Sequence, residues 1–87
     1  MEKVEIANEI QKILKKMAPE VDLEKVDTMK PLRGQFEIDS MDFANFLVKI
    51  HEKYGIEIPQ SDYSKLITID DAATYIQKMI LKRGNQH

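Results

Sequence analysis

The chain has 87 residues, contains no cysteine and carries a formal net charge of −2 from 13 basic and 15 acidic side chains. This length predicts one small core and a single domain over residues 1–87, and the lack of cysteine excludes disulfides and thiolate metal sites. The start has no apolar run typical of a signal peptide, and no stretch approaches the roughly 18 apolar residues of a membrane span. We therefore expect a cytoplasmic protein without membrane insertion.

The acidic charge is concentrated in one segment. Residues 18–39 hold three basic and six acidic side chains, whereas residues 1–17 and 61–87 each sum to +1. Nucleic acid is disfavoured as a partner because a polyanion requires a basic patch. The three phenylalanines and three tyrosines have no basic residues interleaved with them, and this also argues against a nucleic-acid stacking surface.

A first helix is predicted from about Glu2 to Met17, because apolar residues recur there at helical spacing and Pro19 then ends the pattern. Residues 18–39 form a long connection, which is unusual in so small a domain unless it is functional. Six apolar residues are predicted to hold this connection against the core: Val21, Leu23, Val26, Leu32, Phe36 and Ile38.

A second helix is predicted to begin at Ser40 and to end near Tyr54, where Gly55 supplies a C-terminal stop. Its apolar residues are predicted to form two neighbouring rows, so the helix is expected to lie centrally and to contact several elements. The first row comprises Phe43, Leu47, Ile50 and Tyr54, and the second comprises Met41, Ala44 and Val48.

A short helical turn is predicted over Ser61 to Lys65, and a last helix after Asp70 or Asp71, whose charges suit a helix N-terminus better than a metal site. The tail from about residue 83 is expected to fray. No alternation long enough for a sheet occurs. The predicted fold is all-α: a small four-helix bundle of three main helices and one short helix, with a long loop between the first and second.

Ser40 stands between two aspartates where the second helix begins. Asp39 or Ser40 can act simply as a helix cap, since both residue types satisfy free backbone N–H groups. If Asp39 caps alone, the Ser40 hydroxyl is left free in the first turn, where the helix dipole favours a phosphate ester. Both interpretations are open at this point.

A role for Ser40 as a hydrolytic nucleophile is not supported. His51 lies eleven residues further along the same predicted helix, about 16 Å away along its axis, which is too far for proton transfer. His87 lies in the tail, and the chain has no G-x-S-x-G elbow. The sequence therefore does not predict an enzyme.

Three stretches, "IDSMDF", "YGIEIP" and "DYSKLITIDDAATYI", resemble the acyl carrier protein family in content and mutual spacing, over about residues 3–81. The Asp-Ser-Leu motif of the family matches Asp39-Ser40-Met41, and Asp42 matches the acidic residue that commonly follows. The resemblance implies a 4′-phosphopantetheine arm joined covalently to Ser40, whose terminal thiol holds acyl groups as thioesters. A cysteine-free chain is consistent with a thiol supplied by such an arm.

The resemblance also implies partners: a phosphopantetheinyl transferase, and enzymes that load and process acyl groups in fatty acid, polyketide or related lipid biosynthesis. Asp39, Met41 and Asp42 are the expected partner contacts, with no metal and a monomeric chain. Two alternatives remain open. One is a peptidyl or D-alanyl carrier using the same arm, and the other is an unmodified helical docking module.

The chain departs from the family pattern in two places. Glu37 occupies the position three residues before the serine where relatives usually have glycine. The second helix of fatty acid synthesis carriers is strongly acidic, whereas here Asp42 and Glu52 are accompanied by Lys49 and Lys53. Because charge complementarity governs encounter rate and partner choice, this difference predicts a specialised carrier rather than a housekeeping one.

Overall fold

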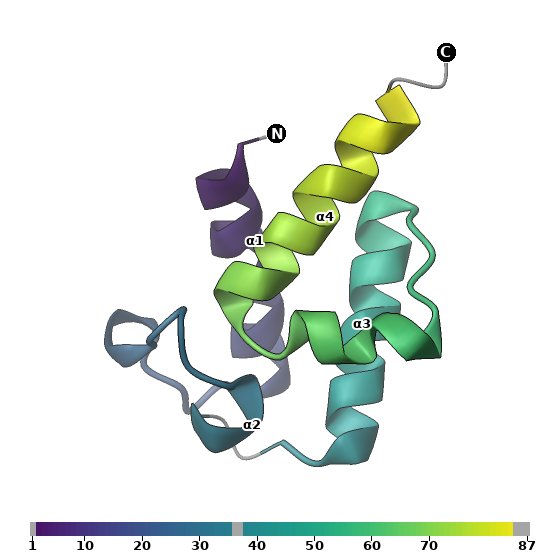
Figure 1. Cartoon of the computed structure of the whole chain (residues 1–87). Coiled ribbons are helices and arrows are strands. Elements are labelled where there is room, and N and C mark those ends of the chain that lie inside the picture. The colour runs from purple at the N-terminus through teal and green to yellow at the C-terminus, as the bar shows by residue number, and fades with distance from the viewer. Residues whose placement is uncertain (1, 36–37, 85–87) are drawn as a thin grey trace.

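The computed structural model describes residues 2–35 and 38–84, with positions 83 and 84 described by their backbone alone. Its helical class is as predicted, and the described residues contain no strand beyond an isolated antiparallel bridge between Pro31 and Thr68. Long helices are joined by shorter helical segments (Figure 1). The long helices are α1 (Lys3–Met17), α3 (Ser40–Tyr54) and α4 (Ile69–Gly84); the short ones are η1 (Leu23–Lys25), α2 (Leu32–Gln35) and η2 (Gln60–Leu66).

The N-terminal end of α3 lies away from both ends of the chain. In Figure 1, α1 and α4 lie side by side, and α3 stands beside them, joined to α4 through η2. The first turn of α3 lies at the end of the molecule opposite both termini. The predicted first helix, second helix and short turn are confirmed to within a residue or two.

One hydrophobic cluster receives side chains from all three long helices. Each helix has a helical-period apolar face, so burying these faces together removes them from water. The buried members are Ile6, Ile10, Ile13 and Leu14 of α1, Leu32 of α2, Phe46, Leu47 and Ile50 of α3, Ile56 of the following connector, Leu66 of η2, and Ile69, Ala72, Ala73 and Ile76 of α4.

The prediction that the two apolar rows of α3 are neighbours is wrong. Met41 is 76% exposed, Val48 is 51% exposed, and Ala44 is also exposed. The buried face centres on Phe46, Leu47 and Ile50. At about 100° per residue, Met41 and Val48 point roughly 150° away from that centre, so their row lies on the opposite side of the helix rather than beside the first row.

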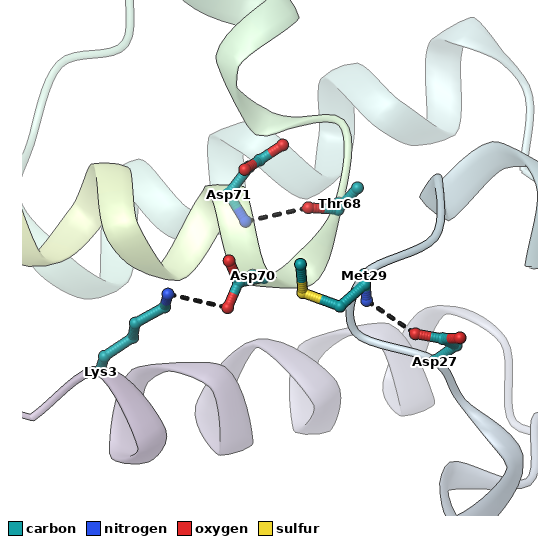
Figure 2. Close-up of polar contacts among 6 residues, drawn as sticks. All are labelled: Lys3, Asp27, Met29, Thr68, Asp70 and Asp71. Carbon is teal, nitrogen blue, oxygen red and sulfur yellow. Dashed lines mark hydrogen bonds and ion pairs between the residues drawn. The ribbon is translucent and has the colours of Figure 1, made fainter.

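The last helix begins at Ile69, before Asp70 rather than after it as predicted. The Thr68 hydroxyl accepts the backbone N–H of Asp71 (2.9 Å), which is a side-chain cap that the prediction did not consider. Lys3 of α1 forms an ion pair with Asp70 (2.8 Å), as Figure 2 shows. The two aspartates therefore lie in the first turn of α4, where the helix dipole favours negative charge.

The long connection between α1 and α3 is more ordered than a loop, because η1 and α2 lie within it. The Gln35 side-chain amide accepts the N–H of Asp27 (2.7 Å) and donates to the carbonyl oxygens of Asp27 (2.6 Å) and Lys30 (3.0 Å). The backbone carbonyl of Thr28 accepts the N–H of Asp70, which ties the connection to α4. Of the apolar residues predicted to hold it, Leu32 is buried, Val21, Val26 and Ile38 pack partly buried against the core, Leu23 is only partly buried, and Phe36 lies outside the described residues.

The predicted fraying from about residue 83 falls mostly outside the described residues. The backbone of α4 continues to Gly84, so the first two positions of the predicted tail are helical.

Candidate functional site

The start of α3 is fixed by a reciprocal pair of hydrogen bonds. Asp39 has an extended backbone, and its Oδ1 accepts the N–H of Asp42 (2.9 Å). Asp42 Oδ2 in turn accepts the N–H of Asp39 (3.3 Å). This capping box satisfies two backbone donors at the helix end. It places the first helical residue at Ser40.

Ser40 is exposed at this first helical position. Because the carboxylate of Asp39 makes the cap, the Ser40 hydroxyl is not needed for it. The adjacent Met41 is the most exposed large apolar residue among those described, at 76%. The arrangement therefore presents a primary alcohol on a fixed helix end, open to a large reagent or enzyme. The sequence left open whether Asp39 or Ser40 caps the helix, and the structure assigns the cap to Asp39.

Among the residues that the structure describes, the only histidine is too far from Ser40 to act as its base. His51 lies on the same helix, about 16 Å further along its axis, and its Nδ1 is 2.5 Å from the carbonyl oxygen of Ile56. That contact joins the C-terminal end of α3 to the connector after it. In the part of the chain that is described, no group of three His, Asp or Glu side chains is placed to hold a metal ion.

One of the basic residues on α3 is engaged within the molecule. Lys53 forms an ion pair with Glu9 of α1 (2.8 Å), and Lys12 approaches the same carboxylate (3.3 Å). Hydrogen bonds from Lys53 and Lys12 hold the pKa of Glu9 below its usual value, and the bond to Glu9 raises the pKa of Lys53. Sequence spacing gave no indication of this pair, because Glu9 and Lys53 are far apart along the chain.

A groove of about 600 Å³ lies between α3, the connector after it, η2 and α4. Apolar side chains make up most of its wall, and its polar groups include those of His51, Glu57 and the Tyr63 hydroxyl. The ring of Phe43 meets that of Tyr63 edge to face, with centroids 6.2 Å apart, which links α3 to η2. The apolar wall comprises Leu47, Val48, Ile58, Pro59, Tyr63 and Met79.

A hydrogen bond ties the wall formed by η2 to α4, and an ion pair lies within η2 itself. Tyr75 donates its hydroxyl to Asp62 Oδ2 (2.7 Å), and Lys65 pairs with Asp62 Oδ1 (3.2 Å). The bonds from Tyr75 and Lys65 lower the pKa of Asp62. Partial burial, followed by the bond to Asp62, raises the pKa of Tyr75 to about 12. These contacts are therefore intact at neutral pH.

Among the helices described, none combines the length and apolar character that crossing a bilayer requires.

Residues 4–76 match the family described as "Phosphopantetheine attachment site". An acyl carrier protein from Rubrobacter xylanophilus is 30% identical over 76 residues, which are 87% of this chain and 93% of that protein. One from Campylobacter hominis is 46% identical over 41 residues, covering 47% of this chain and 52% of that protein.

A further relative is the meromycolate extension acyl carrier protein of Mycobacterium leprae, which is 38% identical over 50 residues, 58% of this chain and 44% of that protein. The matches to the Campylobacter and Mycobacterium proteins thus span about half the length of those relatives. Proteins of this kind carry a phosphopantetheine prosthetic group and act as carriers rather than catalysts. Since the family match covers most of the sequence and one relative aligns over nearly its whole length, this chain belongs to the phosphopantetheine-binding acyl carrier protein family.

Proposed function

We propose that Ser40 is the attachment point of a covalent 4′-phosphopantetheine arm, and that the protein shuttles acyl groups as thioesters between biosynthetic enzymes. The observation that carries this proposal is the exposure of Ser40 at the first position of α3, with Asp39 acting as a separate cap. The chain has no thiol of its own, and the arm supplies one. In this proposal α1, α3, η2 and α4 form the four-helix frame of a single carrier domain.

At the start of α3, the backbone N–H groups favour a phosphodiester on Ser40, whereas two nearby carboxylates disfavour it. The first backbone N–H groups of a helix lack intrahelical acceptors and carry partial positive charge, which favours an anion. Asp39 and Asp42 place two carboxylates beside the same turn, and these repel a phosphate. The site is therefore not expected to bind free phosphate, and retention of the arm depends on the covalent bond to Ser40.

Attachment is a group transfer in which all atoms are accounted for. The Ser40 Oγ forms a bond to the phosphorus of coenzyme A that bears the pantetheine. The pyrophosphate bond breaks, adenosine 3′,5′-bisphosphate leaves, and the hydroxyl proton is released. The chain itself contributes an accessible oxygen on a rigid helix end, whereas activation of that oxygen comes from the transferase.

The test is co-expression with a phosphopantetheinyl transferase, followed by intact-mass measurement and peptide mapping. We expect one phosphopantetheine per chain, mapped to the peptide that contains Ser40 and not to the peptides with Ser61 and Ser64, the other serines of the chain. An unmodified mass in the presence of an active transferase would instead favour the helical docking module.

The groove beside α3 is proposed to shelter the acyl chain. It is bounded by apolar side chains on α3, η2 and α4, and its volume of about 600 Å³ is in the range of small-molecule sites. Burial of an acyl chain there removes apolar surface from water.

We also propose that the protein is a specialised carrier serving a dedicated pathway. α3 carries two acidic residues, Asp42 and Glu52, and two basic residues, Lys49 and Lys53, so its formal charge is zero with His51 neutral. Charge complementarity sets encounter rates, and partners adapted to a strongly acidic carrier are expected to use this helix poorly. In a malonyl transfer assay at matched ionic strength, a malonyl transferase of fatty acid synthesis should prefer a strongly acidic carrier. Equal use of the two carriers would contradict the proposal.

A further inference from the structure

Three aromatic side chains on α3 and η2 are in contact. The rings of Phe43 and Phe46 are tilted against each other with centroids 6.2 Å apart. The ring of Phe43 also meets that of Tyr63 edge to face, again at 6.2 Å. Phe46 is fully buried, whereas Phe43 and Tyr63 are half-buried. We call these three residues the aromatic cluster, and ring pairs of this kind are favourable beyond the area that they bury.

The aromatic cluster lies between Ser40 and the groove of about 600 Å³. Phe43 is three residues after Ser40, about 4.5 Å along the axis of α3. The groove residues on α3 begin at Leu47 and end at His51, about 10 and 16 Å from Ser40 along the same axis. Tyr63 both contacts Phe43 and lines the groove, and η2, which carries Tyr63, crosses α3 beyond its first turn (Figure 1). The end of the groove that faces Ser40 is therefore bounded by the rings of Phe43 and Tyr63.

Tyr63 is held in this position from two sides. Its ring contacts Phe43 on α3, which in turn packs against the fully buried Phe46. The residue before it, Asp62, accepts a hydrogen bond from the Tyr75 hydroxyl on α4 (2.7 Å). The Tyr63 ring can therefore open this end of the groove only by leaving Phe43, which costs the favourable ring contact.

We propose that Tyr63, held by Phe43, determines which acyl chains the groove shelters, and that it sets a minimum chain length. The inference rests on the proposed roles of Ser40 and of the groove, and an acyl chain on the arm enters the groove past Tyr63. The cost of separating the two rings is the same for every chain, whereas each methylene that enters adds favourable burial. Short chains therefore stay outside, and only unbranched chains that bury several methylenes shift the ring to its open position.

The test loads the carrier with butyryl, octanoyl or dodecanoyl groups, using a phosphopantetheinyl transferase that accepts the corresponding acyl-coenzyme A. For each protein, the shift in Tm is measured by circular dichroism relative to the same protein with a free arm thiol. In the unsubstituted protein we expect butyryl to shift Tm by less than about 1 °C and dodecanoyl to raise it by about 5 °C. In Tyr63→Ala, butyryl should already raise Tm by about 3 °C, because no ring has to be displaced.

Two further variants separate the ring from its surroundings. Tyr63→Phe is the matched control: it keeps the ring and removes only the hydroxyl, so its Tm shifts should follow those of the unsubstituted protein. Phe43→Leu leaves Tyr63 in place and removes the ring that holds it, so butyryl should raise Tm as it does in Tyr63→Ala. Because Phe43 is only half-buried, Phe43→Leu replaces Tyr63→Ala as the decisive variant if the latter fails to fold.

The same dependence of Tm on chain length in the unsubstituted protein and in the variants that lose a ring overturns the inference alone. If no acyl group of any length raises Tm in any of these proteins, the groove does not shelter the chain, and that part of the proposed function fails with the inference. Failure of the transferase to load Ser40 overturns the carrier role itself. The three failures are therefore distinguishable.

Discussion

Ser40→Ala is expected to abolish phosphopantetheine attachment completely while leaving the helical content unchanged. The substitution removes the oxygen that would form the phosphodiester. The fold should not be affected, because Ser40 is exposed and Asp39, not Ser40, caps α3. Intact mass after incubation with a transferase and coenzyme A measures the first effect, and far-ultraviolet circular dichroism measures the second.

The matched control for Ser40→Ala is Ser64→Ala. Ser64 is also exposed and lies in η2, a helical segment away from the first turn of α3. We expect Ser64→Ala to gain one phosphopantetheine at the rate of the unsubstituted chain. Full modification of the Ser40→Ala variant would show that another hydroxyl is the acceptor, and the assignment of Ser40 would then be wrong.

Leu47→Ala is expected to lower the free energy of unfolding by about 2–5 kcal/mol. Leu47 is 3% exposed and belongs to the central cluster, so its truncation removes buried apolar atoms and leaves a cavity. Such a loss is a large part of the stability of a small domain. Urea denaturation followed by circular dichroism measures the change through the transition midpoint, provided that the slope stays constant.

The neighbouring Val48→Ala supplies the control. Val48 is 51% exposed on the opposite side of the same helix, and substitutions at exposed positions usually change stability by no more than about 0.5 kcal/mol. Both positions lie on the same helix and both are changed to alanine, so a large difference between their losses of unfolding free energy reports side-chain burial more than helix propensity. Equal losses at both positions would contradict the placement of Leu47 in the core and of Val48 on the surface.

Sequence periodicity was a good guide to the three long helices and a poor guide to what α3 contacts. Ile6, Ile10 and Leu14 recur at the spacing of one helix face, and they are buried as expected. On α3 the apolar residues occur on both sides, and periodicity alone cannot tell a buried row from an exposed one. The exposure of Met41 and Val48 is decided by where the neighbouring helices lie.

The remaining errors have local causes. The start of α4 was placed too late because Thr68, not an aspartate, makes the cap. The order within the long connection depends on the Gln35 amide, which contacts backbone groups five and eight residues away. Hydrogen bonds between a side chain and the backbone cannot be predicted from the spacing of apolar residues.

The site itself was predicted from the sequence in its local features. The start of α3 at Ser40 follows from known preferences at helix N-termini and is confirmed. The sequence left open whether Asp39 or Ser40 makes the cap, and the structure assigns the cap to Asp39. The roles of Asp39, Met41 and Asp42 as partner contacts stay predictions. The pairing of Lys53 with Glu9 was not predictable, since it joins helices whose packing the sequence does not reveal.

The most direct test of the central claim is to identify the group on Ser40 in protein purified from its native cell. Mass spectrometry of the peptide that contains Ser40 should show a phosphopantetheine ester, free or acylated, and the mass of the acyl group would then name the cargo. Ser40 found only as an unmodified hydroxyl, in cells whose other carriers bear the arm, would contradict the account.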